Sequence, residues 1–147
     1  MSTCLLDTNI LLYLANSAAP EHNLAKAAVT RMLASSDRLT LAPQVLFEFW
    51  SAATRPTSAN GLGWTVPQTR LAIDGFRSTF LMLEEPPAVV DLWLELVVTH
   101  ELKGRPIHDA HLLATMQANG VTRLLTFNVS DFPALAGLTI LTPESGS

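Results

Sequence analysis

The sequence has little charge, a single cysteine and no long apolar run. Of its 147 residues only 15% are charged and 48% are hydrophobic, which excludes a disordered chain and fits one domain with a substantial core. No apolar stretch reaches the roughly 18 residues that a membrane span needs. No basic stretch precedes the first apolar segment, so we expect neither a signal peptide nor a membrane protein.

The cysteine and charge counts indicate the redox environment of the protein and the kind of surface it offers to nucleic acid. Cys4 is alone and cannot form an internal disulfide, which fits a reducing cytoplasm, and its apolar surroundings predict a buried, inert thiol. The chain has 9 basic and 13 acidic residues and a net charge of −4. This argues against a broad basic face for nucleic acid but leaves room for a small basic rim around an acidic metal site.

Strand-like and helix-like segments alternate along the whole chain, which favours an α/β fold with a mostly parallel sheet of four to five strands. We expect one domain over residues 1–142 and a frayed tail over 143–147. Helix 87–101 is expected to bury one apolar face made of Val90, Trp93, Leu94, Val97 and Val98. The predicted strands are 3–6, 39–42, 79–83, 123–126 and 139–141, and the other predicted helices are 9–15, 21–35, 43–53, 66–77 and 107–119.

Four carboxylates follow the predicted strands or begin the predicted helices: Asp7, Glu48, Asp109 and Asp131. The strands of an open parallel sheet end at one common edge, where ligands bind. Carboxylates that converge there repel one another unless a cation lies among them. Hard divalent cations take oxygen ligands, and Mg²⁺ uses one or two carboxylates together with water and substrate phosphate. The pattern therefore indicates a metal-dependent phosphodiester enzyme.

The first two acids each have a simpler explanation. Asp7 is placed to cap the next helix, although Thr8 offers a second capping side chain that would leave Asp7 free to face a cleft. Glu48 belongs to a polar stripe with Gln44, Ser51 and Arg55, and such a stripe is either a solvated helix face or the wall of a cleft. Both alternatives stay open at this point.

The last two acids either belong to the metal site or have an ordinary local role in the structure. Asp109 lies in the first turn of its helix, where the helix dipole favours any carboxylate. Asn128 and Asp131 follow a strand, as turn and capping residues do. His108 and His111 flank Asp109, but without a cysteine cluster or a His-Glu-x-x-His run they do not predict zinc.

Taken together, the motifs resemble a known family. LLDTNILLY at residues 5–13, Glu48 in a helix after the second strand, HDAHLLA at 108–114 and LTFNVSDF at 125–132 occur in the order found in PIN-domain nucleases. The resemblance covers nearly the whole chain and is strongest to VapC-type toxin ribonucleases. Asn128 stands where many relatives have an acid, and Asp131 follows, so the fourth acidic position is ambiguous.

The resemblance implies a three-layer α/β/α sandwich and Mg²⁺- or Mn²⁺-dependent endoribonuclease activity. It implies that Asp7 and Asp109 bind the metal, that Glu48 holds the metal or its water, and that Asp131 with Asn128 completes the pocket. The expected supporting residues for water or phosphate are Thr8, Asn9 and His108, and the expected RNA contacts at the rim are Arg55, Lys103 and Arg105.

It also implies a small antitoxin partner and a homodimer. The apolar residues considered for these contacts are Leu14, Phe47, Trp50, Leu62 and Trp64, with the core as the simpler place for most of them. Two other functions remain open, an RNA-processing nuclease without a toxin role and a non-catalytic binding module of the same fold. A haloacid-dehalogenase-type phosphatase is disfavoured because its second aspartate is replaced here by Asn9.

Overall fold

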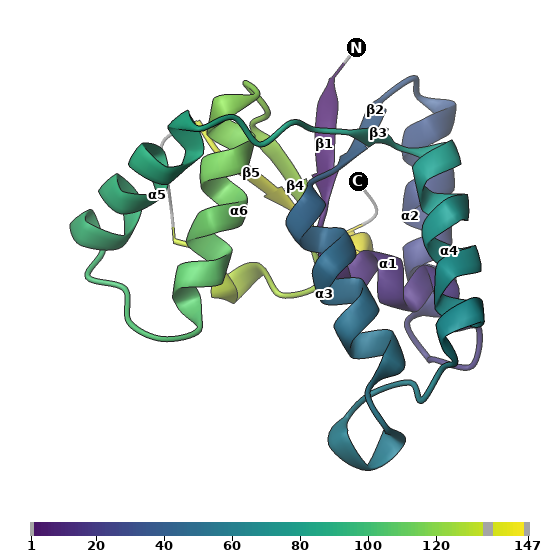
Figure 1. Ribbon diagram of the computed structural model, residues 1–147. Helices are drawn as coiled ribbons and strands as arrows, with labels where there is room; N and C mark the ends of the chain where they lie inside the picture. The colour runs from purple at the N-terminus through teal and green to yellow at the C-terminus, as the bar shows by residue number, and fades with distance from the viewer. Residues whose placement is uncertain (1, 134–136, 146–147) are drawn as a thin grey trace.

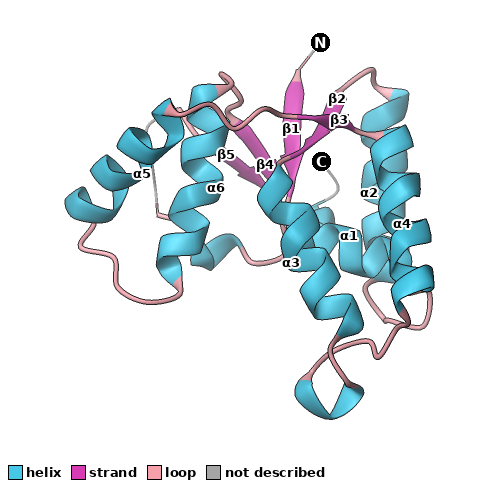
Figure 2. Cartoon of the chain, in the orientation of Figure 1, coloured by secondary structure: helices cyan, strands magenta, loops and turns pink. Residues whose placement is uncertain are grey.

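A single parallel sheet of five strands forms the centre of the molecule (Figures 1 and 2). The computed structural model describes residues 2–133 and 137–145. The strand order is β3-β2-β1-β4-β5, and every neighbouring pair is parallel. The strands are β1 (Thr3–Leu6), β2 (Arg38–Leu41), β3 (Leu81–Met82), β4 (Arg123–Leu125) and β5 (Thr139–Leu141).

The helices cover the sheet on both sides, as the α/β/α prediction required. Helices α1 to α4 form one contacting group, and α5 packs against α6 on the other side (Figure 1). Their bounds are α1 (Thr8–Ala15), α2 (His22–Ala34), α3 (Pro43–Thr54), α4 (Val66–Thr79), α5 (Ala88–Thr99) and α6 (Pro106–Ala118), with short 3₁₀ turns η1 (Thr57–Ala59), η2 (Val129–Asp131) and η3 (Pro143–Ser145). None of the helices in the described part of the chain has the length and apolarity to cross a membrane.

The central strand β1 explains why the sheet is parallel and covered on both faces. Cys4, Leu5 and Leu6 are all completely buried, and a strand without a polar face needs helices above and below it. Burial raises the pKa of the Cys4 thiol to about 12, so this cysteine stays protonated and unreactive. The prediction of a buried, inert thiol is confirmed.

Several predicted boundaries move where local hydrogen bonding overrides the sequence pattern. The expected strand 79–83 shrinks to Leu81–Met82, because α4 continues to Thr79. Helix α1 begins at Thr8 and not at residue 9, because Asp7 is its N-cap. The tail was expected to be frayed, yet Pro143–Ser145 form a 3₁₀ turn that contacts α2; residues 146–147 lie outside the described residues.

The predicted apolar face of α5 is buried only in part: Trp93 and Val97 pack against the core, and the other three residues do not. Val90, Leu94 and Val98 are 59%, 46% and 73% exposed, whereas Val89 and Leu96 are buried. Helix α5 packs chiefly against α6, so only a narrow stripe of it is covered. The apolar side chains on its other face stay in contact with solvent.

The long connection between α3 and α4 is held against the core at its far end. The backbone N–H groups of Leu62 and Trp64 donate to the carbonyl oxygens of Ala52 and Ala53, and the Trp64 ring packs edge-to-face on Phe49. Gly61 has no room for a side chain, because a Cβ there would lie 2.0 Å from the Arg55 carbonyl oxygen.

We predict that Phe49→Ala lowers the free energy of unfolding by about 3–5 kcal/mol, the usual range for a buried Phe. Phe49 is fully buried and also contacts Phe76. Phe47→Ala is the matched control on the same helix: Phe47 is 72% exposed, and its removal should cost about 0.5 kcal/mol or less. Equal losses in urea denaturation would contradict this description of the core.

Candidate active site

A polar cavity of about 660 Å³ lies where the predicted acidic residues meet. All four acids line it: Asp7 from the end of β1, Glu48 from α3, Asp109 from the first turn of α6 and Asp131 from η2. Thr8, Asn9, His108 and Asn128 line the same cavity, as do Arg55 and Arg105. The expected convergence at the carboxyl edge of the sheet is therefore present in the structure.

Asp7 serves as a helix cap and as a cavity residue at once. Its backbone N–H donates to the Leu125 carbonyl oxygen, which fixes it beside β4. One carboxylate oxygen accepts from the Thr8 backbone N–H at 2.8 Å, and the other from the Thr126 hydroxyl at 2.8 Å and the Asn9 amide at 3.3 Å. Burial raises the pKa of Asp7, and the Thr126 hydrogen bond opposes that shift. The two interpretations of Asp7 are thus compatible.

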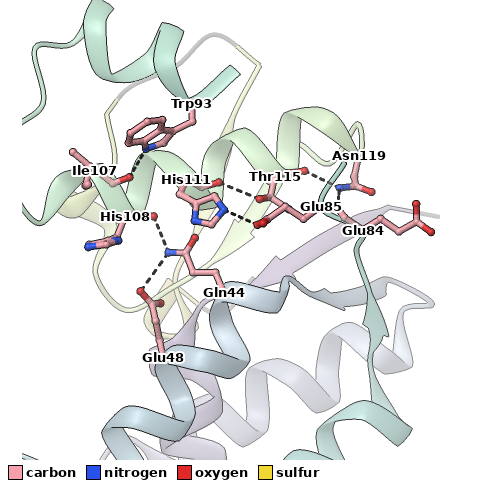
Figure 3. A network of polar contacts seen from close by, with 10 residues as sticks. All are labelled: Gln44, Glu48, Glu84, Glu85, Trp93, Ile107, His108, His111, Thr115 and Asn119. Carbon is pink, nitrogen blue, oxygen red and sulfur yellow. Dashed lines mark hydrogen bonds and ion pairs between the residues drawn. The ribbon is translucent and has the colours of Figure 1, made fainter. Parts of the chain in front are cut away.

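Glu48 is held in place at both carboxylate oxygens. The Thr8 hydroxyl donates to one oxygen at 2.7 Å, and the Gln44 amide donates to the other at 3.3 Å. The same Gln44 nitrogen donates to the His108 carbonyl oxygen at 2.7 Å (Figure 3). Gln44 therefore connects α3 to the start of α6 and sets the position of Glu48 relative to Asp109.

Asp109 is the acid most disturbed by its surroundings. Burial is the largest cause that raises its pKa, followed by the negative charges of Asp7, Asp131 and Glu48, and Arg105 opposes them. The resulting pKa is about 6, against an ordinary value of 3.8. The four carboxylates are therefore close enough to repel one another.

Asp131 and Asn128 both lie at the exposed side of the cavity. The Asp131 charge contributes to the raised pKa of both Asp7 and Asp109. Asn128 precedes η2 without a side-chain capping bond, and its backbone N–H donates to the Thr126 hydroxyl. Of the two, Asp131 is the one that brings negative charge to the cluster.

The remaining predicted residues differ in their partners and in whether they line the cavity. Thr8 and Asn9 have partners inside the protein: the Thr8 hydroxyl bonds Glu48, and the Asn9 amide bonds Asp7, Thr126 and the Phe127 backbone. Arg55 and Arg105 line the cavity, whereas Lys103, in the exposed connection between α5 and α6, is not among its lining residues. His111 pairs with Glu85 away from the acids (Figure 3).

Two supporting residues, Thr126 and Gln44, were not predicted. Thr126 is completely buried, accepts a hydrogen bond from Asn9 and donates one to Asp7. Only 7% of Gln44 is exposed, and its side-chain oxygen has no hydrogen-bond partner among the residues that the structure describes. The one sequence signal for Gln44 was its place in the polar stripe with Glu48.

The donor set is suited to a hard cation held partly by water. Within residues 2–133 and 137–145, no three Asp, Glu, His or Cys side chains form a ready-made metal-binding group. Mg²⁺ does not require one, because it binds through one or two carboxylates and keeps several waters. Burial is the main cause of the raised Asp109 pKa, and the repulsion by the other three acids adds to it; a divalent cation would relieve that repulsion. Asp7 and Asp109 fit the role of direct ligands.

Comparisons with known proteins agree with this site and fold. Residues 4–138 match the PIN domain family. The chain is 30% identical over 129 residues to Ribonuclease VapC24 of Mycobacterium tuberculosis, and the match covers 86% of this chain and 87% of that protein.

Solved structures share the fold over nearly the whole chain. VapBC2 from Rickettsia felis, bound to a promoter DNA fragment, has a TM-score of 0.71 at 18% identity and covers 95% of this chain and 98% of that one. VapBC-1 from nontypeable Haemophilus influenzae has a TM-score of 0.71 at 19% identity, with 97% and 98% covered. VapC20 of Mycobacterium tuberculosis, a toxin that cleaves the sarcin-ricin loop, has a TM-score of 0.63 at 20% identity, with 87% and 92% covered. This protein therefore belongs to the PIN-domain family and is related to its VapC members.

Proposed function

We propose that this protein is a Mg²⁺- or Mn²⁺-dependent endoribonuclease and the toxin of a toxin–antitoxin pair. The observation that carries the proposal is the convergence of Asp7, Glu48, Asp109 and Asp131 on one cavity. The 30% identity to a protein named as a VapC ribonuclease supports it.

The site residues have distinct roles in this proposal. Asp7 and Asp109 hold the cation, which when bound neutralises charge on the phosphate and lowers the pKa of water. Glu48 is kept in one orientation by Thr8 and Gln44, and it accepts a hydrogen bond from the attacking water.

Hydrolysis then needs a positioned phosphodiester. The water oxygen forms a bond to phosphorus as the water gives up one proton to solvent, the bond from phosphorus to one ribose oxygen breaks, and that oxygen takes up a proton from solvent. Arg55 and Arg105 at the cavity wall contact phosphates of the RNA backbone, a role that positions RNA without reading its sequence. Asp131 adds negative charge around the cation, and Asn128 adds a polar side chain beside it.

We further propose a small antitoxin partner and a homodimer. Structures similar to this one include VapBC2 and VapBC-1. Of the apolar residues considered for these contacts, Phe47 is 72% exposed, and Trp50 lines a surface depression with it. Leu14, Leu62 and Trp64 pack against the core, which makes them structural.

Two other functions make different predictions. An RNA-processing nuclease would cleave RNA without arresting growth and would lack a short upstream gene for a DNA-binding partner. A non-catalytic binding module would bind RNA and leave it intact at any Mg²⁺ concentration. The closeness of four acids to one another favours a catalytic site over a binding module.

We predict that Asp7→Asn preserves the fold and abolishes cleavage. Asn caps helices about as well as Asp, so a residue that only caps would tolerate the change. Loss of a cation ligand should instead reduce the cleavage rate by orders of magnitude, on the order of 10²-fold or more. Growth arrest on induction, RNA cleavage with Mg²⁺ and circular dichroism test this.

The matched control for Asp7 is Asp74→Asn. Asp74 is an exposed acid on α4 that pairs with Arg70, and its replacement should leave cleavage at the wild-type rate. A folded Asp7→Asn protein that still arrests growth and cuts RNA at that rate would falsify the metal role of Asp7.

We predict that Asp109 destabilises the metal-free protein. An acid whose pKa is higher in the folded state disfavours folding once it ionises. The contribution of Asp109 to the free energy of unfolding therefore falls as the pH rises from about 4 to about 6, the interval between its ordinary and its folded pKa. In EDTA, Asp109→Asn should raise the melting temperature at pH 7, and this gain should vanish near pH 4.

The same variant tests the shared cation. Mn²⁺ should raise the melting temperature of the wild type, since any ligand of the native state does so. Asp109→Asn should reduce this rise. An equal rise in both proteins would mean that Mn²⁺ binds elsewhere.

We predict that Asp131→Ala lowers RNA cleavage at saturating Mn²⁺ more than Asn128→Ala. Both residues line the cavity, but Asp131 is the one whose charge reaches Asp7 and Asp109. If Asn128→Ala were the more damaging change, the fourth acidic position would be assigned to the wrong residue.

A further inference from the structure

A second cavity shares a wall with the acidic one. It has a volume of about 550 Å³ and lies between α5, α6 and the segment that follows β3. His108 lines both cavities. A ligand that bound at the acids could therefore extend past His108 into the second cavity, which we call the side cavity.

The walls of the side cavity are mainly apolar and include one aromatic ring. Trp93 lines it, and its indole N–H donates to the Ile107 carbonyl oxygen at 2.9 Å (Figure 3). This bond fixes the ring without using its faces. Val90 lies at the exposed border, and Pro86 and Pro87 form another apolar part of the wall.

The side cavity also has a polar end. His111 pairs there with Glu85, and both side chains remain partly exposed at 32% and 38%. His108 also lines the acidic cavity, whereas the His111 ring is directed toward Glu85 (Figure 3). An apolar slot with an aromatic wall and a polar end is complementary to a flat heterocycle with hydrogen-bonding edges.

We infer that the side cavity binds one unpaired nucleobase of the RNA, next to the phosphodiester that is cleaved. This inference rests on the proposed ribonuclease function. Proteins recognise single-stranded RNA by stacking splayed bases on aromatic side chains and by hydrogen bonds to the base edges. Trp93 supplies the aromatic wall, Glu85 and His111 supply the polar groups, and His108 lies where the backbone passes between the cavities.

The continuity with the acids favours a nucleobase over a protein segment. A backbone phosphate in the acidic cavity brings its own neighbouring base to the shared wall. A protein segment would also find hydrogen-bonding partners in Glu85 and His111, but the wall that the two cavities share at His108 would have no role in binding it.

Oligoribonucleotides with one abasic residue at successive positions around the cleavage site test this inference. With the wild-type protein, removal of the base at one fixed position should lower kcat/KM about tenfold, as loss of one stacked base does. Removal of the other bases should have smaller effects. A uniform profile along the oligonucleotide would overturn the inference.

Two tryptophan substitutions on α5 connect that profile to the side cavity. Val90→Trp fills the border of the cavity and should remove the difference between the intact and the abasic substrate at the sensitive position. Val98→Trp is the matched control: Val98 is 73% exposed and does not line the cavity. Equal behaviour of the two variants would overturn the assignment.

Binding measurements separate this inference from the proposed function. Fluorescence anisotropy of the same oligonucleotides with the Asp7→Asn protein reports base recognition whether or not the wild type cleaves RNA. Position-dependent binding without wild-type cleavage would overturn the nuclease and keep the nucleobase site. If Val90→Trp changed only oligomer mass or antitoxin binding, the side cavity would belong to a protein interface.

Discussion

Mutual repulsion of carboxylates at the edge of the sheet is the constraint on which the site depends. Asp7, Glu48, Asp109 and Asp131 share one cavity, and burial, together with the negative charges of the other three acids, raises the pKa of Asp109 to about 6. Folding tolerates this arrangement because hydrogen bonds hold Asp7 and Glu48 in place. The site therefore resembles other functional sites in which local instability is retained for binding.

The central strand of the sheet positions the first of these acidic residues. β1 is buried between β2 and β4, and the Asp7 backbone N–H continues the pairing with β4 one residue past the strand. Gln44 joins α3 to the start of α6, the helices that carry Glu48 and Asp109. Asp7, Glu48 and Asp109 are thus placed by regular strands and helices, which suits chemistry that needs precise placement.

The sequence predicted the alternating fold and the four acids because both depend on local patterns. Apolar runs indicate buried strands, and each acid follows such a run or begins a helix.

Thr126 and Gln44 were not predicted because their hydrogen-bond partners, Asp7 and His108, are 119 and 64 residues away in the sequence. The exposure of Val90, Leu94 and Val98 on α5 was not predicted for a related reason: the apolar stripe has the helical period, but burial depends on neighbouring elements, and here mainly α6 covers the helix. The edge strand β3 is shorter than predicted because α4 continues to Thr79, into the residues expected to begin the strand.

The central claim is that these acids exist to hold a divalent cation, and anomalous X-ray diffraction from crystals soaked in Mn²⁺ tests it most directly. The account predicts an anomalous peak between the carboxylates of Asp7 and Asp109, completed by water, and its loss in Asp109→Asn crystals. A well-ordered cavity without such a peak at saturating Mn²⁺, or a peak bound only by other residues, would contradict the account.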